Sequence, residues 1–371
     1  MKTIYSSFLL LTLTLLSSTL FAQTTLDGSF GGRNYKLRIP PAASSGDLLP
    51  LVVSMHGFTQ NAAEQEAQTG MNAVADTANF FVVYPNGTLT FLFLRGWNAS
   101  LGSGGVDDVG YLNSLVDDLI ANYNIDPDKI FATGFSNGGG MSVALACATP
   151  GRYKAISPVG AAIDPGNAAL CNLSDFPALI QFHGTSDAIV PYSGGFGQAP
   201  AVDYFRAWTA QDACGSVNFE NLPNPVVTDG SSVSRATLEA CDGGVTHQFY
   251  RINSGDHSVP GPGGQNQDIN SSVEQWLFFR KNGGAPSARL AAPLEATLFS
   301  PNPAATFTQI QTGVDADWSL TVFDLQGRVV RSESGNGPQG WLDVSNLSSG
   351  SYVVALQSGE SIQRSRLQVV H

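Results

Sequence analysis

The chain has 371 residues, of which 40 are glycine and 13% are charged, and its formal net charge is −12 at pH 7. An acidic balance without a basic run argues against binding to nucleic acid or to anionic membranes, because both attract clustered lysine and arginine. The length suggests roughly two domains, and little charge with much glycine is typical of an extracellular, loop-rich protein that contains β-strands.

The first 22 residues have the pattern of a secretory signal peptide. Lys2 precedes an apolar stretch from Phe8 to Leu16, and Ala22 offers a small residue at the cleavage point. The alternative is a membrane anchor, which needs about 20 apolar residues. Because this stretch is shorter and no later stretch is long enough, we expect an exported protein without a membrane span.

Apolar runs alternate with helical patterns along the next 250 or so residues. Short apolar runs predict buried strands, and apolar residues spaced by three and four predict helices. This alternation implies an α/β protein with a mostly parallel sheet covered on both faces. The predicted strands are residues 35–40, 51–55, 80–85, 129–134, 178–183 and 246–252, and the predicted helices are residues 61–78, 107–123, 141–147 and 271–280.

The composition changes after Lys281. The next residues contain Gly, Pro, Ser and Ala without apolar periodicity, which predicts a linker. Beyond it, short alternating strands such as 319–323 and 352–356 predict a small all-β sandwich. The expected organisation is a signal peptide at 1–22, an α/β domain at 23–281, a linker at 282–296 and a β-sandwich at 297–371.

Four cysteines are spread through the α/β region, and none forms a Cys-x-x-Cys pair, so we expect no metal or redox site and no cofactor. An even number in an exported protein favours two disulfides. Three connectivities are possible. Pairing of sequence neighbours is the default expectation, which gives Cys147–Cys171 and Cys214–Cys241.

The pentapeptide Gly134–Gly138 has the pattern Gly-x-Ser-x-Gly, with a β-rich run before it and a helix-compatible run after it. That context is the one a nucleophile elbow requires. The tight turn would project the Ser136 hydroxyl and direct the following helix N-terminus at the reacting group. The alternative is a glycine-rich turn with an inert serine. We take Ser136 as the nucleophile of an α/β-hydrolase fold.

A serine nucleophile needs a base, and in this fold the chain order is serine, acid, histidine. His257 lies in a Gly/Pro-rich loop between a strand and the last helix, where a base is expected. The alternative for His257 is an exposed loop residue, and the other histidines that follow Ser136 are His183, His247 and His371. We therefore assign the base to His257.

Asp187 is the predicted acid, because it follows the strand that ends at His183 and lies between Ser136 and His257. Its task would be to hold the imidazole tautomer and stabilise the imidazolium. The competing carboxylates are Asp175, which precedes a strand, Asp203, which starts a helix, and Asp256, which is adjacent to the base.

Acyl transfer also needs hydrogen-bond donors for the oxyanion. We expect the backbone N–H of Asn137 to be one and that of Phe58 the other, with Thr59 next in order, and His56 to shape this loop. Trp97 lies in a glycine-rich loop and is assigned to substrate binding, with a core position as the alternative. Asp107 and Asp108 are expected to be helix caps.

The motifs around these residues resemble the extracellular esterase family of feruloyl esterases, acetyl xylan esterases and polyhydroxybutyrate depolymerases. The resemblance covers roughly residues 28–280 and implies a serine esterase. Val259 stands where members usually have Trp, and Phe58 where they often have Cys or Tyr; these departures concern the substrate and leave the expected chemistry unchanged. The segments that carry the resemblance are 96–98, 106–111, 134–141, 183–191 and 255–261, together with the Cys214 and Cys241 bracket.

The C-terminal region resembles a type IX secretion sorting domain, which implies recognition by the outer-membrane export machinery and removal on export. The matching segments are 300–303, 322–330 and 342–352, followed by a short terminal strand. The alternative is a carbohydrate-binding or fibronectin-like module with a sugar platform formed by Trp318 and Trp341.

The leading prediction is a secreted serine esterase that acts on feruloyl or acetyl esters of plant polysaccharides. A polyhydroxybutyrate depolymerase with the same triad is the main alternative. A serine peptidase and a non-catalytic surface adhesin are the others, and the complete set of Ser136, Asp187 and His257 argues against the adhesin.

Overall fold

The computed structural model describes residues 24–89, 94–102, 104–161, 171, 177–195, 198–210, 212–283, 298–300, 302–311, 316–324, 329–358 and 361–371. The expected signal peptide and all but the first two residues of the expected linker lie outside these ranges. Within them, no helix combines the length and the apolar character needed to cross a membrane.

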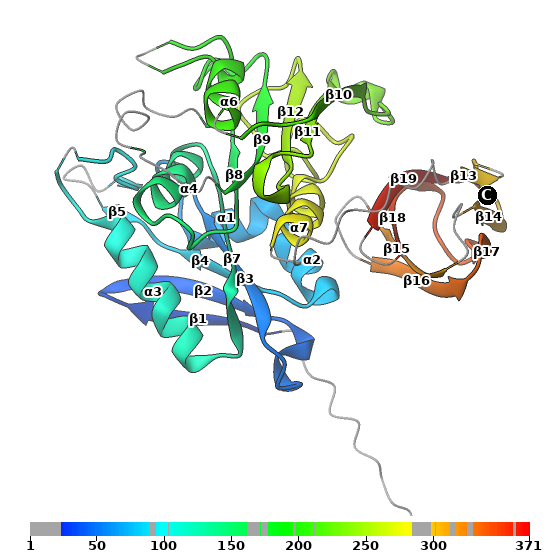
Figure 1. Cartoon of the computed structure of the whole chain (residues 1–371), viewed down its shortest axis with the longest axis horizontal. Helices are drawn as coiled ribbons and strands as arrows, with labels where there is room; N and C mark the ends of the chain where they lie inside the picture. Colours follow the sequence, from blue (N-terminus) through cyan, green and yellow to red (C-terminus); the bar gives the residue numbers. More distant parts are fainter. Residues whose placement is uncertain are drawn as a thin grey trace, which may run out of the picture.

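A ten-stranded sheet forms the centre of the α/β region, in the order β1-β2-β4-β3-β7-β8-β9-β12-β11-β10 (Figure 1). The six strands from β4 to β12 in this order run parallel, and antiparallel hairpins extend the sheet at both edges. The strands are β1 (Thr24–Phe30), β2 (Arg33–Ile39), β3 (Leu49–Met55), β4 (Phe81–Pro85), β7 (Ile125–Phe135), β8 (Ala155–Val159), β9 (Ala178–Gly184), β10 (Ser216–Asn221), β11 (Ser232–Glu239) and β12 (His247–Asn253), and a separate ribbon pairs β5 (Thr88–Leu89) with β6 (Arg95–Gly96).

Helices cover both faces of this sheet and bury its strands on either side, as expected for parallel strands. The apolar side chains of α3, α4 and α6 pack in one core cluster, and those of α1, α2 and α7 pack in a second cluster. Along β3, Leu51 and Val53 belong to the first cluster and Val52 to the second. The helices are α1 (Ala62–Thr69), α2 (Met71–Ala78), α3 (Asp108–Asn122), α4 (Asn137–Ala148), α6 (Ala201–Thr209) and α7 (Ser271–Asn282).

One predicted helix is wrong in its length. Residues 61–78 form two helices, α1 and α2, because Gly70 takes the left-handed conformation with φ 60° and both ends α1 and begins α2. Glycine adopts this conformation without the steric cost that a Cβ imposes.

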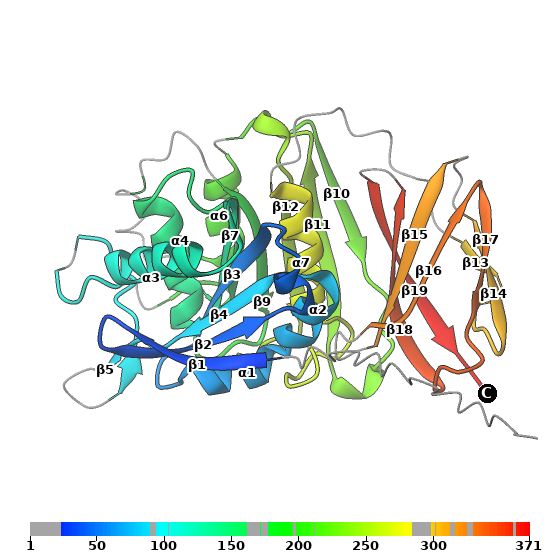
Figure 2. The same cartoon turned by 90° about the horizontal axis from the view of Figure 1, so that it is seen from below.

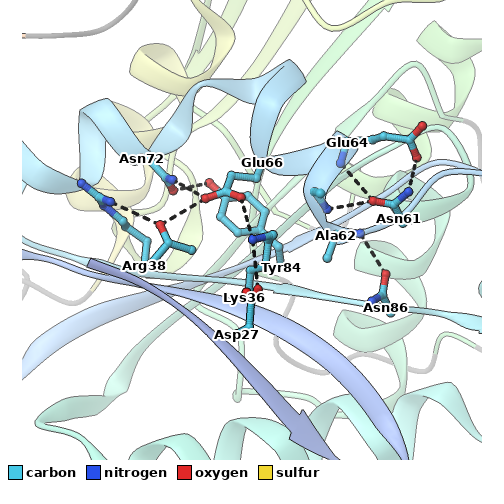
Figure 3. A network of polar contacts seen from close by, with 12 residues as sticks. Asp27, Lys36, Arg38, Asn61, Ala62, Glu64, Glu66, Asn72, Tyr84 and Asn86 are labelled. Carbon is cyan, nitrogen blue, oxygen red and sulfur yellow. Dashed lines mark hydrogen bonds and ion pairs between the residues drawn. The ribbon is translucent and has the colours of Figure 1, made fainter. Parts of the chain in front are cut away.

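A polar network attaches the N-terminal hairpin to these two helices (Figure 3). Lys36 on β2 forms ion pairs with Asp27 on β1 and with Glu66 on α1. Glu66 also accepts a hydrogen bond from Asn72 on α2, and Asn72 in turn accepts one from the Tyr84 hydroxyl. The network therefore fixes α1 against the edge of the sheet. The loop that connects β3 to α1 contributes to the site described below.

The C-terminal region contains two antiparallel sheets that enclose a small core of their own. Trp318 is buried there, so the platform that sequence analysis considered for Trp318 and Trp341 does not form; Trp341 is 65% exposed. One sheet has the order β13-β14-β17 and the other β16-β15-β18-β19, with β13 (Leu298–Ser300), β14 (Phe307–Gln311), β15 (Asp317–Phe323), β16 (Val329–Asn336), β17 (Gln339–Asp343), β18 (Gly350–Ser358) and β19 (Ser361–Val369).

Disulfides join Cys147 to Cys171 and Cys214 to Cys241, which is the pairing of sequence neighbours. The first connects the end of α4 to the chain that leads to β9, and the second connects the start of β10 to the end of β11.

Candidate active site

Ser136 lies in the sharp turn between β7 and α4 with φ 52°, a conformation that non-glycine residues rarely adopt. The turn is this tight because both flanking glycines lack a side chain. A Cβ on Gly134 would lie 2.3 Å from the backbone of Gly138, and a Cβ on Gly138 would lie 2.2 Å from the carbonyl oxygen of Met55. The geometry is that of a nucleophile elbow.

His257 and Asp187 meet at this turn, although 121 and 51 residues separate them from Ser136 in the chain. The Ser136 hydroxyl lies 3.0 Å from His257 Nε2, and His257 Nδ1 lies 2.7 Å from Asp187 Oδ2. In the tautomer with the proton on Nδ1, the imidazole donates to the carboxylate and Nε2 is free to accept the serine proton. This arrangement suits nucleophilic acyl transfer.

The Asp187 carboxylate is buried but well supplied with donors. Its Oδ1 accepts hydrogen bonds from the backbone N–H groups of Ile189 and Val190 at 2.9 and 2.8 Å. Burial works to raise the pKa of Asp187, but the hydrogen bond from His257 and the two backbone donors hold the pKa below its ordinary value. Asp187 is therefore ionised at neutral pH and can stabilise an imidazolium.

Among the alternatives, Asp256, His183 and His247 each have a hydrogen-bond partner outside the triad, and His183 Nε2 also lies 3.6 Å from Asp187 Oδ2. Asp256 accepts a hydrogen bond from the Ser258 hydroxyl at 2.5 Å. His183 is buried and donates to the carbonyl oxygen of Val190, and burial lowers its pKa. His247 is buried and contacts Asp212 at 2.8 Å.

The loop after β3 lies against the start of α4, so the two expected oxyanion donors belong to adjacent segments. Asn137 is the first residue of α4, where a backbone N–H has no partner within the helix. Among the described residues, no acceptor takes the N–H of Phe58. Thr59 is not a donor here, because its N–H already binds the carbonyl oxygen of Arg95 at 2.7 Å.

His56 holds this loop as a neutral imidazole. Nδ1 lies 2.7 Å from the carbonyl oxygen of Gly57, and Nε2 accepts the N–H of Gly87 at 3.0 Å. Burial lowers the pKa of His56 to about 4. A neutral ring with one donor and one acceptor matches both partners, which agrees with a role in shaping the loop.

The side chain of Asn137 forms hydrogen bonds with both backbone polar groups of Trp97. The Trp97 N–H donates to Asn137 Oδ1 at 2.7 Å, and Asn137 Nδ2 donates to the Trp97 carbonyl oxygen at 3.0 Å. The indole ring is 6% exposed and donates to the carbonyl oxygen of His56. Trp97 is therefore mainly a core residue that supports the loop.

The expectation for Asp108 is wrong, whereas Asp107 caps α3 as predicted by accepting the N–H of Gly110. Asp108 is buried, forms an ion pair with Arg33 at 2.5 Å and accepts the backbone N–H of Asn98 at 2.6 Å. It anchors the loop that follows Trp97. Sequence reasoning missed Arg33, since nothing local relates a residue on β2 to one on α3.

A cavity of about 190 Å³ lies beside Phe58 and the loop that contains Trp97. This volume is more than ten times the roughly 10–15 Å³ that one water requires. The lining of the cavity is largely apolar and includes Phe58, Leu89, Trp97, Asn98, Val106 and Asp108.

Comparisons with known proteins identify esterases that are similar to this chain. The family model described as "Esterase PHB depolymerase" matches residues 33–175. Feruloyl esterase C of Emericella nidulans is 30% identical over 226 residues, which cover 59% of this chain and 75% of that protein. The chain belongs to this esterase family.

Two further similarities were found. Poly(3-hydroxyalkanoate) depolymerase C of Paucimonas lemoignei is 32% identical over 151 residues, covering 38% of this chain and 35% of that protein. The structure of an acetyl xylan esterase from Aspergillus awamori matches at 15% identity with a TM-score of 0.49, covering 69% of this chain and 99% of that one.

The C-terminal region of the esterase is a secretion sorting domain. The family model "Secretion system C-terminal sorting domain" matches residues 299–370, which include both C-terminal sheets apart from Leu298. The protein is therefore a secreted carboxylesterase, and the expected fold, an α/β-hydrolase with a small all-β sandwich, is confirmed. Membership of this esterase family does not agree with the two alternatives from the sequence, a non-catalytic adhesin and a serine peptidase.

Proposed function

We propose that the esterase uses Ser136 as nucleophile, His257 as general base and acid, and Asp187 as the group that orients and stabilises His257. The observation that carries this proposal is the continuous hydrogen-bonded chain from the Ser136 hydroxyl through both imidazole nitrogens to the Asp187 carboxylate. Its distances lie within the range of about 2.6–3.2 Å over which a proton can be transferred.

In the first half of the reaction, Ser136 Oγ attacks the ester carbonyl carbon and its proton passes to His257 Nε2. The oxyanion forms near the N–H groups of Phe58 and Asn137, which we assign as its donors. The tetrahedral intermediate collapses, and the departing alcohol takes the proton from His257. In the second half, water attacks the acyl-enzyme, gives its proton to His257 and releases the acid when Ser136 recovers that proton.

The substrate that we infer is an acyl ester carried by a plant polysaccharide, with a feruloyl or an acetyl group. The largely apolar cavity beside Phe58 supports an acyl group of several carbon atoms, and a relative of this chain bears the name feruloyl esterase. Polyhydroxybutyrate is the second candidate, because a relative bears the name poly(3-hydroxyalkanoate) depolymerase and the same triad can open its esters.

The test compares three substrates with the same purified enzyme: methyl ferulate, acetylated xylan and polyhydroxybutyrate. We expect turnover of at least one of the first two to exceed that of polyhydroxybutyrate, and Ser136→Ala to abolish all hydrolysis. A preference for polyhydroxybutyrate would replace the proposed substrate and leave the mechanism standing. Hydrolysis by a folded Ser136→Ala variant would refute the mechanism.

We also propose that the α/β domain extends over residues 23–281 and that residues 297–371 are the part that the outer-membrane export machinery recognises. The family match to a sorting domain supports this assignment. Cells that produce the chain without residues 297–371 should retain the esterase, and its appearance in the medium at the normal level would contradict the proposal.

A further inference from the structure

The outer face of the sheet β13-β14-β17 carries two exposed aromatic rings. Strands β14 and β17 pair so that Gln309 lies opposite Trp341 and Phe307 lies opposite Asp343. Side chains alternate between the two faces of a strand. Phe307 and Trp341 therefore share one face as diagonal neighbours, and they are 51% and 65% exposed.

The opposite face of the same strands fills the core of the sorting domain. Thr308 and Ile310 on β14 and Leu342 on β17 are completely buried. Trp318 supplies the large aromatic ring of this core, and the ring packs directly against Gly335 and Gly340. The core is thus complete without Phe307 and Trp341, so their exposure does not serve packing inside the domain.

On β14 and β17, the outer face is defined by Phe307, Gln309, Gln339, Trp341 and Asp343, and apart from the two rings these side chains are polar. Gln309 Nε2 donates to Gln339 Oε1 at 3.2 Å, and Asp343 accepts the hydroxyl of Ser345 at 2.6 Å. Two rings are therefore bordered by two amides and a carboxylate. In Figures 1 and 2 this sheet lies on the side of the sorting domain away from the α/β region.

We propose that this outer face binds a neutral polysaccharide. The apolar C–H faces of sugar rings can stack on Trp341 and Phe307, whose π faces carry partial negative charge. The amides of Gln309 and Gln339 offer donors and acceptors to hydroxyl groups, and Asp343 offers an acceptor.

Alternative occupants fit this chemistry less well. A protein partner held by apolar contact would require a larger apolar area than two neighbouring rings provide. The net charge of −12 and the Asp343 carboxylate disfavour acidic polymers and anionic membranes. A neutral polymer with many hydroxyl groups matches both the rings and the amides. The proposal does not depend on which ester the active site cleaves.

The test is co-sedimentation of the purified full chain, with its sorting domain intact, with insoluble arabinoxylan. Trp341→Ala should weaken binding by about tenfold or more, as is common when a central tryptophan is removed from a binding face. Trp341→Tyr should retain most of the binding because a ring remains. Phe219→Ala is the matched control, since Phe219 is a 76% exposed aromatic residue on β10 of the α/β region. It should bind as the wild type does.

Hydrolysis of p-nitrophenyl acetate and the thermal unfolding profile should both be unchanged in all three variants, which verifies that the α/β domain and the sorting domain are folded. Equal binding by Trp341→Ala and the wild type would overturn the proposal, as would a wild-type protein that stays in the supernatant. A wild-type dimer that Trp341→Ala converts to a monomer would also overturn it, because the face would then bind a second copy.

Discussion

Asp187→Asn should disable the base without unfolding the protein, because of how the two carboxylate oxygens are used. Oδ1 accepts the N–H groups of Ile189 and Val190, and Oδ2 faces His257 Nδ1 at 2.7 Å. The asparagine oxygen will take the first position, because an NH2 group there would meet two donors. The NH2 group is then directed at His257, and Nδ1 must become an acceptor.

The imidazole proton consequently moves to Nε2, the atom that has to accept the proton of Ser136. By analogy with other triads, the loss in kcat reaches about 10⁴. At about 1.4 kcal/mol for each factor of ten, this corresponds to roughly 5.5 kcal/mol in activation free energy. The assay is steady-state hydrolysis of p-nitrophenyl acetate at neutral pH, with thermal unfolding to verify the fold.

Asp256→Asn is the matched control for this substitution. Its carboxylate binds the Ser258 hydroxyl rather than the imidazole, so we expect less than about a tenfold loss. If folded Asp187→Asn enzyme retained kcat within tenfold of the wild type, or if Asp256→Asn had the larger effect, the assignment of Asp187 would be refuted.

The remaining predictions concern the nucleophile, pH, a disulfide and the sorting domain. Ser136→Ala should lower kcat by several orders of magnitude, because the members of a triad act as a unit, and turnover near the wild-type value would exclude Ser136. Burial lowers the pKa of His56 to about 4, from an ordinary 6.5. As pH falls from 6.5 to 4, His56 is therefore protonated in the unfolded chain but not in the folded one, and the free energy of unfolding of the wild type should drop by about 3 kcal/mol more than that of His56→Gln. Parallel pH profiles of the two proteins in urea unfolding would contradict this. Replacing Cys214 and Cys241 together with alanine opens a loop of 27 residues and should cost roughly 3–4 kcal/mol in the same measurement, whereas an unchanged midpoint would show that the bridge does not stabilise the fold. A chain that ends at residue 282 should keep kcat on p-nitrophenyl acetate, because the triad lies before that point, and an inactive but folded product would show that the sorting domain contributes to the site.

The parts of the site that sequence predicts are those with a local signature. The elbow at Ser136 is visible because two glycines and the flanking strand and helix are adjacent in the chain. Asp187 and His257 follow from chain order and from loops after strands. The ion pair of Arg33 and Asp108 has no such signature, because its members are 75 residues apart and either charge alone is typical of a solvated surface.

The same distinction applies to the fold. Most central strands are predicted because burial on both faces requires continuous apolar runs. The central strand β8 (Ala155–Val159) is missed, because Ser157 and Pro158 interrupt its apolar run. The edge strands β10 and β11 are not predicted either, because four of the six β10 residues from Ser216 to Asn221 are polar and the strand is held by backbone pairing rather than by burial. The break at Gly70 could not be predicted from the pattern of residues 61–78, because that pattern is compatible with one continuous helix. The left-handed conformation of Gly70 nevertheless ends α1.

Asn137 connects the expected oxyanion site to the wall of the cavity. Its backbone N–H is the expected oxyanion donor, and its side chain forms hydrogen bonds with both the N–H and the carbonyl oxygen of Trp97. Evolution cannot readily reshape the cavity wall at Trp97 without also displacing the group that is to receive the negative charge. New substrate preferences should therefore arise at Leu89 or Val106, which line the cavity at positions that are not tied to the elbow.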